Sequence, residues 1–298
     1  MMKIANLQKN ILLAPYTTYK VGGSADYFVE VKNSEELINA ITEARKNNID
    51  YFILGTGANI LVADKGFRGL VIKNSANNFT ISENIIIAES GVMIENLINI
   101  STEKGLSGFE HFAGIPSTVG GALWQNLHFL SPDRTKTVYI DSIFESAEIL
   151  DESNNIKTVK KDFFEFGYDN SILHHKNIIV IKAKFKLEQK GNSLIQNQIN
   201  ENLKWRAEKQ PQLEQYPSCG SVFKKIENVG AGRLIDKVGL KGYKIGNAQI
   251  SEKHANFIIN TGNAKAQDIL SLIKLTQEEV YKNTGHKLET EIKFVGEF

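Results

Sequence analysis

The sequence predicts a mixed α+β protein with two domains, and three observations lead to this class. Helical and strand-like patterns of hydrophobic residues alternate along the whole chain of 298 residues. That length is sufficient for two ordinary domains. Hydrophobic residues make up 42% of the chain and charged residues 23%, which is typical of a soluble enzyme and excludes a disordered chain, a collagen-like repeat and a coiled coil.

The first 73 residues have the pattern of a small α/β lobe. A helix follows Asn33 or Ser34, either of which can cap it. Its apolar residues recur at i, i+4 and i+7 and form one stripe, made by Leu37, Ile41 and Ala44. Gly55 ends a compact hydrophobic run that is typical of a buried strand. The strands expected in this lobe are residues 27–31, 51–54 and 69–72.

Residues 74–189 form a second lobe that is richer in strands. A helix begins near Ile94 and ends at Gly105, because glycine readily adopts the backbone conformation that follows many helices. A polar, glycine-containing stretch places a domain boundary near residue 190, so the two domains are residues 1–189 and 190–298. The strands expected in the second lobe are residues 79–82, 85–88, 142–150 and 178–185.

The second domain combines helices with short strands. Its first helix is stopped by Pro211 and carries one apolar stripe, formed by Ile195, Ile199 and Leu203. A long helix near the end has one face formed by Ile269, Ile273, Thr276 and Val280. In a last strand at 287–295, alternation places three residues on the core face: Leu288, Ile292 and Phe294. The other elements expected are a short helix at 231–238 and strands at 243–250 and 254–259.

The charges of the chain are almost balanced, with 35 Lys and Arg against 34 Asp and Glu. Proteins that neutralise nucleic-acid phosphates usually carry a basic excess, so this balance argues against a nucleic-acid partner. The single cysteine, Cys219, can form neither an internal disulfide nor a thiolate metal cage, and the six histidines lack metal-ligand spacing, so no metal is expected. The N-terminus lacks the apolar core of a signal peptide, and no apolar run approaches the ~18 residues that span a membrane, which predicts a cytoplasmic protein without membrane insertion.

Two glycine-rich segments are candidates for binding an anion. They are Leu54-Gly55-Thr56-Gly57-Ala58-Asn59 and Gly114-Ile115-Pro116-Ser117-Thr118-Val119-Gly120-Gly121. Glycines let the backbone turn sharply and bring N–H groups close to an anion. The first segment is neither a Walker loop nor a Rossmann fingerprint, because the Gly-Lys-Ser/Thr run and the third glycine are missing. Each segment alone can be an ordinary turn, but the two together favour a dinucleotide whose pyrophosphate lies between them.

Ser221 follows Gly220 at the point where a turn is expected to enter a strand. An exposed serine in such a place can donate a proton to a reacting atom. It does not fit a hydrolase nucleophile, because no histidine is near in the sequence and the Gly-x-Ser-x-Gly motif is absent. An ordinary serine at a strand edge is the alternative. We interpret the neighbouring Cys219 as a small packing residue.

Charged residues supply two further candidates. Arg206 and Lys209 share one side of their helix at i, i+3. Arg206 lies beside the apolar stripe and is expected to point inward, where a cation needs a partner such as a ligand phosphate. Surface charge on a helix is the alternative. In the last strand, the face opposite the core is either solvated or aims a carboxylate into a cleft, and it carries Glu289, Glu291 and Lys293.

These segments, in this order, resemble the UDP-N-acetylenolpyruvoylglucosamine reductase (MurB) family of flavoproteins over nearly the whole chain. The compact length and the Ser221-Val222-Phe223 form are similar to the shorter, type II branch. The resemblance implies a two-lobed FAD-binding domain of the PCMH/vanillyl-alcohol-oxidase type at residues 1–189 and a substrate-binding domain at 190–298. The segments that carry it, besides the two glycine loops and the final glutamate-containing strand, are Thr17-Thr18-Tyr19-Lys20-Val21-Gly22-Gly23-Ser24-Ala25-Asp26, Gly220-Ser221-Val222-Phe223-Lys224, Ala231-Gly232-Arg233-Leu234-Ile235, Leu240-Lys241-Gly242-Tyr243-Lys244-Ile245-Gly246 and Ser251-Glu252-Lys253-His254-Ala255-Asn256-Phe257.

The resemblance also implies an activity and residue roles. NADPH would reduce bound FAD, and UDP-N-acetylglucosamine enolpyruvate would then be reduced to UDP-N-acetylmuramate, a step of peptidoglycan precursor synthesis, by a monomer. Ser221 would donate the proton, Glu291 would assist protonation, and Tyr168 lies in the catalytic motif. The residues implied to bind substrate are Arg206, Lys209 and Lys224. Those implied to bind FAD are Gly55, Thr56, Gly57, Ala58, Asn59, Gly114, Ile115, Pro116, Ser117, Thr118, Gly120, Gly121 and Asn126.

The sequence departs from the family pattern at three places. The family motif Phe-Gly-Tyr-Arg is present as Phe166-Gly167-Tyr168-Asp169, so Asp169 stands where the family has a catalytic arginine. An anion beside a developing negative charge should weaken its stabilisation. The other two departures are Asn126-Leu127-His128-Phe129 in place of Asn-Ala-Gly-Ala, and Lys224-Lys225-Ile226 in place of Lys-Asn-Pro. Two alternatives therefore stay open: a diverged flavoprotein oxidoreductase of the same fold that acts on another substrate, and a non-catalytic protein that binds FAD or a nucleotide sugar.

Overall fold

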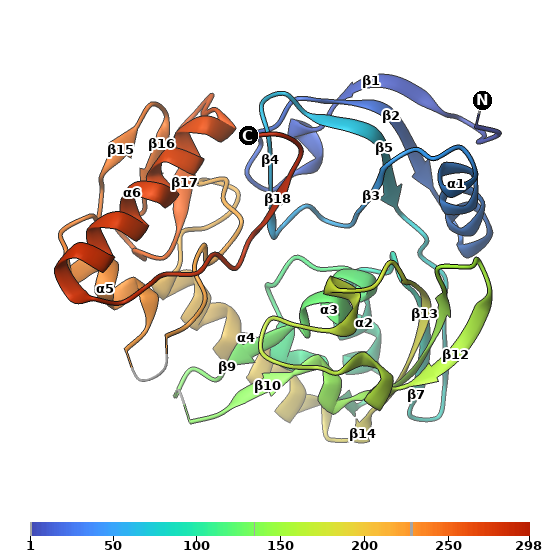
Figure 1. The fold of residues 1–298 in the computed structure, drawn as a ribbon. Coiled ribbons are helices and arrows are strands. Elements are labelled where there is room, and N and C mark those ends of the chain that lie inside the picture. The colour runs from blue at the N-terminus through green and yellow to red at the C-terminus, as the bar shows by residue number, and fades with distance from the viewer. Residues whose placement is uncertain (1, 134, 227–228) are drawn as a thin grey trace. The chain divides into compact units, whose positions relative to one another are not determined.

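The computed structural model describes residues 2–133, 135–226 and 229–298, in which helices and strands alternate along the chain (Figure 1). This alternation confirms the α+β class. The chain forms two compact units: unit 1 is Met1–Leu7, Val29–Gly55 and Ile72–Arg206, and unit 2 is Gln8–Phe28, Thr56–Val71 and Ala207–Phe298. Both units draw on several stretches of the chain, and the proposed domain boundary near residue 190 stays a prediction.

One four-stranded sheet has the order β1-β2-β5-β3. Its strands are β1 (Gln8–Leu12), β2 (Ser24–Val31), β3 (Tyr51–Leu54) and β5 (Phe67–Asn74). Helix α1 (Ser34–Lys46) connects β2 to β3, and its cap is Asn33, whose side chain accepts the Glu36 N–H at 2.9 Å. The expected apolar stripe is confirmed, because no part of Leu37, Ile41 or Ala44 is exposed.

The main sheet of unit 1 is antiparallel, with the order β12-β11-β13-β7-β6. Its strands are β6 (Phe79–Ser82), β7 (Ile85–Glu89), β11 (Phe144–Leu150), β12 (Ile156–Lys160) and β13 (Ile179–Lys186). Helices α2 (Ile94–Glu103) and α3 (Val119–Gln125) contribute to the same core, which is rich in phenylalanine: Phe109, Phe112, Phe144, Phe164 and Phe185. Rings of this size remove a large apolar area from water and so stabilise the sheet.

Short elements complete unit 1. Two strand pairs are β8 (Leu106–Ser107) with β14 (Glu188–Gln189), and β9 (His128–Leu130) with β10 (Thr137–Tyr139). The 3₁₀ helices are η2 (Glu110–Phe112), η3 (Ile140–Ser142), η4 (Lys161–Phe164) and η5 (Ile172–His174). These elements place three loops that carry candidate site residues, after η2, after α3 and before η5.

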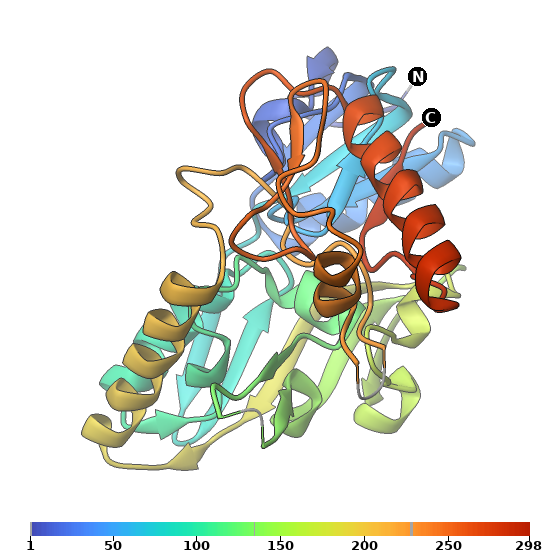
Figure 2. The same cartoon turned by 90° about the vertical axis from the view of Figure 1, so that its left-hand side faces the viewer.

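Helix α4 (Asn192–Lys209), gold in Figure 2, corrects one prediction. Ile195 is buried and Ile199 half-buried, as expected, but Leu203 is 43% exposed. The fully buried residue at this level is its neighbour Asn202. The expected apolar stripe is therefore wrong at Leu203, because the helix turns the polar side chain of Asn202 toward η2, where it forms hydrogen bonds.

In unit 2, helix α6 (Ala266–Thr284) packs against a three-stranded sheet of order β15-β16-β17. The strands are β15 (Lys244–Ile245), β16 (Ala248–Ile250) and β17 (Ile258–Asn260). The helix face predicted from the sequence is confirmed, since all four of its residues are buried: Ile269, Ile273, Thr276 and Val280. The remaining helices of the unit are η1 (Ala14–Tyr16) and α5 (Ala231–Lys237).

The final strand is shorter than expected. Strand β18 (Lys293–Val295) pairs in parallel with β4 (Ile60–Val62). Residues 287–292 lie outside a regular strand because their partner β4 has only three residues; one isolated bridge joins Thr290 to Phe223. The predicted alternation holds nevertheless, since Leu288 and Ile292 are buried and Phe294 packs against the core of unit 2.

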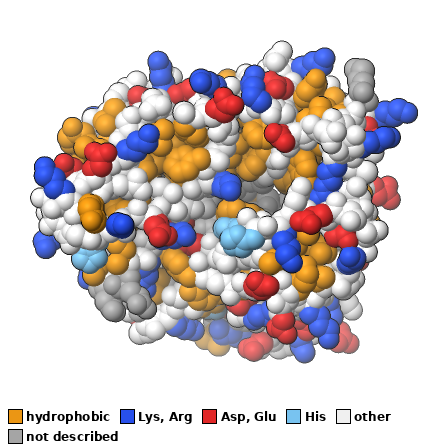
Figure 3. Space-filling model, viewed as in Figure 1, with side chains coloured by type: hydrophobic (Ala, Val, Ile, Leu, Met, Phe, Trp, Pro, Cys, Tyr) orange, Lys and Arg blue, Asp and Glu red, His pale blue; other side chains and the backbone are white. Residues whose placement is uncertain are grey.

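The surface carries charges of both signs. On the face drawn in Figure 3, basic and acidic side chains are interspersed, which agrees with the formal net charge of +1. Among the described residues, no helix has both the length and the apolar character needed to cross a membrane.

Candidate active site

Gly55, directly after β3, is the residue at which the first glycine loop contacts the second. A Cβ atom added at Gly55 would lie only 2.9 Å from Oγ1 of Thr118. The Lys73 ammonium donates a hydrogen bond to the Gly55 carbonyl at 2.6 Å, and burial lowers the pKa of Lys73. Glycine is therefore required at residue 55, because a side chain would press on the second loop.

Residues 56–59 of the first loop belong to unit 2, where the opening motif of the chain holds them. The N–H and the hydroxyl of Thr18 both donate to the Gly57 carbonyl, each at 3.2 Å. Gly57 has φ +68°, and a Cβ atom at this position would overlap the carbonyl oxygen of Tyr16. Only glycine combines the left-handed conformation with so close an approach.

The second glycine loop leads into α3 and is fixed by the backbone around it. The N–H groups of Val119 and Gly120 donate to the carbonyls of Val92 and Ser90, at 2.8 and 2.7 Å. Thr118 caps the helix, because its Oγ1 accepts the Gly121 N–H at 3.2 Å. The loop is thereby held in one conformation by the protein itself.

Asn126 ends α3 in the left-handed conformation, with φ +51°. Its amide donates to the Gly167 carbonyl at 3.1 Å, and its Oδ1 accepts the Asp141 N–H at 3.4 Å. Asn126 thus joins the end of α3 to the turn that carries Tyr168. Both were predicted site residues, and the structure brings their segments together within unit 1.

The donors in the two glycine loops suit an anion. Both loops contain hydroxyl and backbone N–H groups but no acidic residue. Arg206 adds a guanidinium beside the second loop, since a Cβ atom at Gly114 would lie 3.0 Å from its Nε. Within unit 1, the hydroxyls of the second loop and the Arg206 guanidinium match the charge of a pyrophosphate, so the residues present there fit FAD.

Arg206 and Lys209 occupy different surroundings on α4. Arg206 is half-buried, and burial lowers its pKa to about 10, so it remains protonated at neutral pH. Lys209 is exposed at the last residue of the helix. The structure therefore supports the inward orientation predicted for Arg206, whereas Lys209 extends into solvent.

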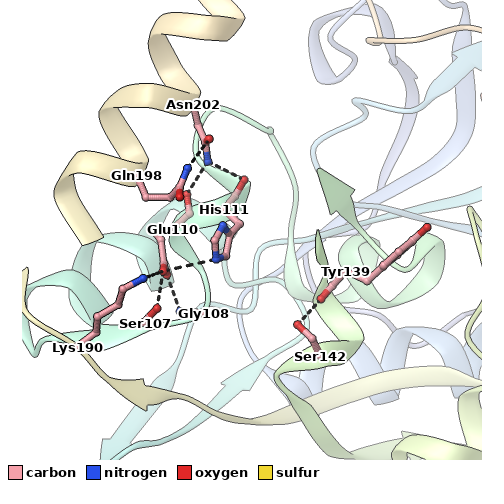
Figure 4. A network of polar contacts seen from close by, with 9 residues as sticks. All are labelled: Ser107, Gly108, Glu110, His111, Tyr139, Ser142, Lys190, Gln198 and Asn202. Carbon is pink, nitrogen blue, oxygen red and sulfur yellow. Dashed lines mark hydrogen bonds and ion pairs between the residues drawn. The ribbon is translucent and has the colours of Figure 1, made fainter. Parts of the chain in front are cut away.

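A polar network attaches α4 to the turn that precedes the second loop (Figure 4). The Asn202 amide donates to the carbonyls of Glu110 and His111, at 3.3 and 3.2 Å. Gln198 in turn donates to Asn202 Oδ1 at 3.0 Å. Asn202 lies one helical turn before Arg206, so this network fixes the helix rotation that brings Arg206 to Gly114.

The carboxylate at the centre of this network is almost inaccessible to solvent. Glu110 is 1% exposed and accepts hydrogen bonds from the Ser107 hydroxyl and the Gly108 N–H. Its Oε1 also lies 3.6 Å from His111 Nε2 and 3.8 Å from Lys190 Nζ. Burial lowers the pKa of His111, and the negative charge of Glu110 opposes that shift. Several donors therefore satisfy the buried carboxylate and stabilise the turn.

Ser221 and Glu291 lie on two segments that pair within unit 2, although they are far apart in the sequence. The Glu291 N–H donates to the Val222 carbonyl at 2.8 Å, next to the Phe223–Thr290 bridge. Ser221 precedes this bridge in an irregular segment, so the expected entrance into a regular strand is wrong. The reason is that the side chain and carbonyl of Asn256 take up the N–H groups of the next two residues.

The first glycine loop reaches the same region of unit 2. The Asn59 carbonyl accepts the Lys293 N–H at 2.9 Å, and the Asn59 amide donates to the Glu291 carbonyl at 3.4 Å. Lys224 lies on the paired segment, with its ammonium 3.6 Å from the exposed carboxylate of Glu289. A predicted cofactor residue, the predicted proton donor and a predicted substrate ligand therefore lie on adjoining segments.

Cys219 is buried directly before this segment. Burial, first of all, raises the pKa of its thiol to about 12. A thiol is nucleophilic only as the thiolate, which is scarce at neutral pH under these conditions. The interpretation of Cys219 as a packing residue is confirmed.

Two of the three sequence departures meet within unit 1. Asp169 is only 4% exposed, and its Oδ1 accepts a hydrogen bond from the Gln125 amide at 3.1 Å. The same oxygen lies 3.5 Å from Nδ1 of His128. The ring of Tyr168 lies 4.8 Å from the His128 ring, and Tyr168 is 38% exposed. The contact between His128 and Asp169 cannot be predicted from the sequence, because the two residues lie in separate segments of the chain.

Sequence reasoning missed Asn202, Glu110 and Gln125. A polar residue inside an amphipathic helix is ordinarily placed on the solvent side, so Asn202 carries no signal of its own. Its hydrogen bonds to the carbonyls of Glu110 and His111 are seen only in the folded chain. Among the described residues, no group of three or more His, Cys, Asp or Glu side chains could hold a metal ion.

Two family models match this chain. Residues 25–157 match the model of an FAD binding domain, which includes both glycine loops. Residues 210–295 match the model of the UDP-N-acetylenolpyruvoylglucosamine reductase C-terminal domain, which includes Ser221 and Glu291.

Full-length relatives extend the match to the whole chain. UDP-N-acetylenolpyruvoylglucosamine reductase of Caldicellulosiruptor bescii is 43% identical over 96% of this chain and 90% of its own. The enzyme of the same name from Caldanaerobacter subterraneus is 41% identical over 99% of this chain and 96% of its own. The crystal structure of UDP-N-acetylenolpyruvylglucosamine reductase (MurB) from Thermus caldophilus is 31% identical, with a TM-score of 0.81 over 97% of this chain and 99% of that one. With such identity along nearly its whole length, the chain belongs to the UDP-N-acetylenolpyruvoylglucosamine reductase (MurB) family.

Proposed function

We propose that this protein reduces UDP-N-acetylglucosamine enolpyruvate to UDP-N-acetylmuramate, with FAD as bound cofactor and NADPH as hydride donor. The observation that carries the proposal is the pairing of the Ser221 and Glu291 segments, next to Asn59 of the first glycine loop, in a member of this family. A protein that only bound a nucleotide would need neither a proton donor nor a carboxylate beside it.

Hydride transfer is the chemistry that FAD supplies when bound. The residues of the chain have the remaining tasks. Hydride addition to the β-carbon of the enolpyruvyl group leaves electrons at the α-carbon, beside the substrate carboxylate. Ser221 donates the proton that the α-carbon needs, and Glu291 assists that transfer. A dianion of this kind is stabilised by fixed hydrogen-bond donors and cations.

Three cations bind the anionic substrate. Arg206 is the best placed of them in unit 1, because it is half-buried against Gly114 and stays protonated. Lys209, which is exposed, and Lys224, which is half-buried, belong to unit 2, and their ammonium groups suit the diphosphate and the carboxylate. Tyr168 acts from unit 1 as a further residue of the catalytic motif. We assign the protein to peptidoglycan precursor synthesis and propose that it works as a cytoplasmic monomer.

Stopped-flow absorbance of FAD-loaded protein tests the proposal. The flavin is reduced anaerobically with one equivalent of NADPH, and UDP-N-acetylglucosamine enolpyruvate is then added. Rapid return of the oxidised flavin spectrum, with UDP-N-acetylmuramate as product, is the expected result. Reduction without reoxidation by this substrate would contradict the proposal.

A second function has one observation in its favour. The buried carboxylate of Asp169 adds negative charge to unit 1, which suits a flavoprotein of this fold whose substrate is less anionic. In that case NADPH would still reduce the flavin, and the enolpyruvyl substrate would not reoxidise it. The same experiment therefore separates the two functions.

A further inference from the structure

We propose that His128 and Asp169 form a charge pair that positions Tyr168, and that the pair depends on protonation of the His128 ring. The pair lies within unit 1 and joins strand β9 to the turn before η5. The link to catalysis rests on the proposed function, because it acts through the role assigned to Tyr168. The existence of the pair is independent of the proposed function.

The backbone holds Asp169 in place independently of the pair. Asp169 has φ +50°, a left-handed conformation in a turn closed by the Gly167 N–H, which donates to the Asn170 carbonyl at 3.0 Å. The Asn126 amide donates to the Gly167 carbonyl, and the Ser171 hydroxyl donates to the Trp124 carbonyl at 2.7 Å. These contacts fasten both sides of the turn to the end of α3. The Asp169 carboxylate is therefore kept inside unit 1 whatever the charge of its neighbours.

A buried carboxylate requires compensation. Gln125 donates to Oδ1 of Asp169, but Oδ2 has no hydrogen-bond partner among the described residues. A buried charge with one neutral donor is costly unless a cation lies near. Among the described residues, the ion-pair contact of Asp169 is with His128, whose Nδ1 lies 3.5 Å from Oδ1.

Two other titratable groups on this side, Tyr139 and Lys161, do not supply that cation. Tyr139 faces His128 from β10, and burial, followed by the charges of Asp169 and Asp141, raises its pKa, so it stays neutral. Lys161 pairs with Asp141 at 3.3 Å. Among the described residues in ion-pair contact with Asp169, the His128 ring can supply the compensating charge when it is protonated.

The His128 ring lies in a row with two tyrosines. Tyr139 is the cross-strand partner of His128, and the centroids of their rings are 5.5 Å apart. The centroid of the Tyr168 ring lies 4.8 Å from that of His128. A protonated imidazole attracts aromatic faces at such distances, and a neutral one does so much less. Tyr168 is the exposed member of this row, and its contact with the His128 ring weakens when that ring loses its charge.

The direction of the pH dependence follows from the pair. A carboxylate at contact distance favours the protonated histidine. The pair contributes only while Asp169 is ionised and His128 is protonated, so its contribution is lost as the pH rises through the titration midpoint of His128 in the folded protein. Both the ordering of Tyr168 and the substrate step should decline over that interval.

NMR titration of the FAD-loaded protein, labelled with ¹⁵N in histidine, tests the pair itself. We expect the midpoint of His128 to fall by about one pH unit or more in Asp169→Asn. His286, which contacts Thr284 in unit 2, serves as the internal control and should keep its midpoint. An unchanged midpoint for His128 would overturn the pair.

Half-reaction kinetics test the positioning role. In the wild type, flavin reoxidation by substrate should slow about tenfold as the pH passes the His128 midpoint, whereas reduction by NADPH should change by less than about twofold. The double variant H128Q/D169N carries no charge at either of these two positions and should lose this pH dependence. If a single variant does not fold, the double variant is used in its place. A double variant that keeps the wild-type profile would overturn the positioning role. Absence of wild-type reoxidation at every pH would refute the proposed function instead, and the NMR titration would still decide the pair.

Discussion

Replacing Asn202 by alanine tests whether the polar network sets the position of Arg206. Asn202 is fully buried, donates to the carbonyls of Glu110 and His111, and accepts from Gln198. Each of these hydrogen bonds contributes on the order of 1 kcal/mol, and the two carbonyls would be left without their donor. We therefore expect unit 1 to lose about 3 kcal/mol of unfolding free energy.

Urea unfolding followed by tryptophan fluorescence measures this loss. Trp124 and Trp205, the two tryptophans of the chain, both lie in unit 1, and Trp205 is on α4 itself. With an ordinary urea dependence of about 1–3 kcal/mol per molar, the midpoint should fall by about 1 M or more. Reoriented Arg206 should also raise the KM for the nucleotide sugar about tenfold, with little change in the rate of flavin reduction by NADPH.

Asn200→Ala is the matched control on the same helix. Asn200 accepts from Gln196 at 3.1 Å, just as Asn202 accepts from Gln198, but Asn200 is exposed. Its removal should change the unfolding free energy by less than about 0.5 kcal/mol and leave KM unchanged. Equal effects of the two substitutions would refute the reasoning, because they would show that the contacts of α4 with Glu110 and His111 contribute nothing.

Three further predictions concern single residues. Ser221→Ala should slow flavin reoxidation by substrate at least a hundredfold while reduction by NADPH persists, and equal loss in both half-reactions would argue against a proton donor. Gly55→Ala should weaken FAD binding in a fluorescence titration, because the new Cβ would press on Thr118, whereas Gly191→Ala, with open space around it, should not; equal affinities would contradict this. Cys219, whose pKa burial raises to about 12, should react with a thiol reagent at pH 8 only after unfolding, and rapid labelling of native protein would contradict its burial.

Local periodicity was sufficient to predict most helices. The faces of α1 and α6 repeat their apolar residues with the helical period, and burial of those residues needs no knowledge of distant segments. Strand lengths were harder, because a strand extends only as far as its partner. The last strand is limited by the three residues of β4, and nothing near residue 290 indicates that β4 is the partner or how long it is.

The position of α4 shows a second limit. Leu203 follows the apolar pattern and Asn202 does not, yet Asn202 is the buried residue. The carbonyls at η2 need donors when the helix covers them, and that need outweighs the gain from burying one more leucine at this contact. A pattern that counts only hydrophobicity has no access to the polar requirements of the surface on which a helix will pack.

Asp169 and His128 are two departures from the family pattern whose side chains are in contact in the folded chain. Each alone resembles damage to a family motif, since one replaces a cation by an anion and the other replaces a small residue by a large one. A carboxylate with no role in a clamped turn would be expected at the surface, where water solvates it. Asp169 is instead 4% exposed, receives a hydrogen bond from Gln125, and contacts His128, a new side chain that can become a cation. The two changes compensate each other in charge, so they constitute one rearrangement of unit 1 rather than two independent losses.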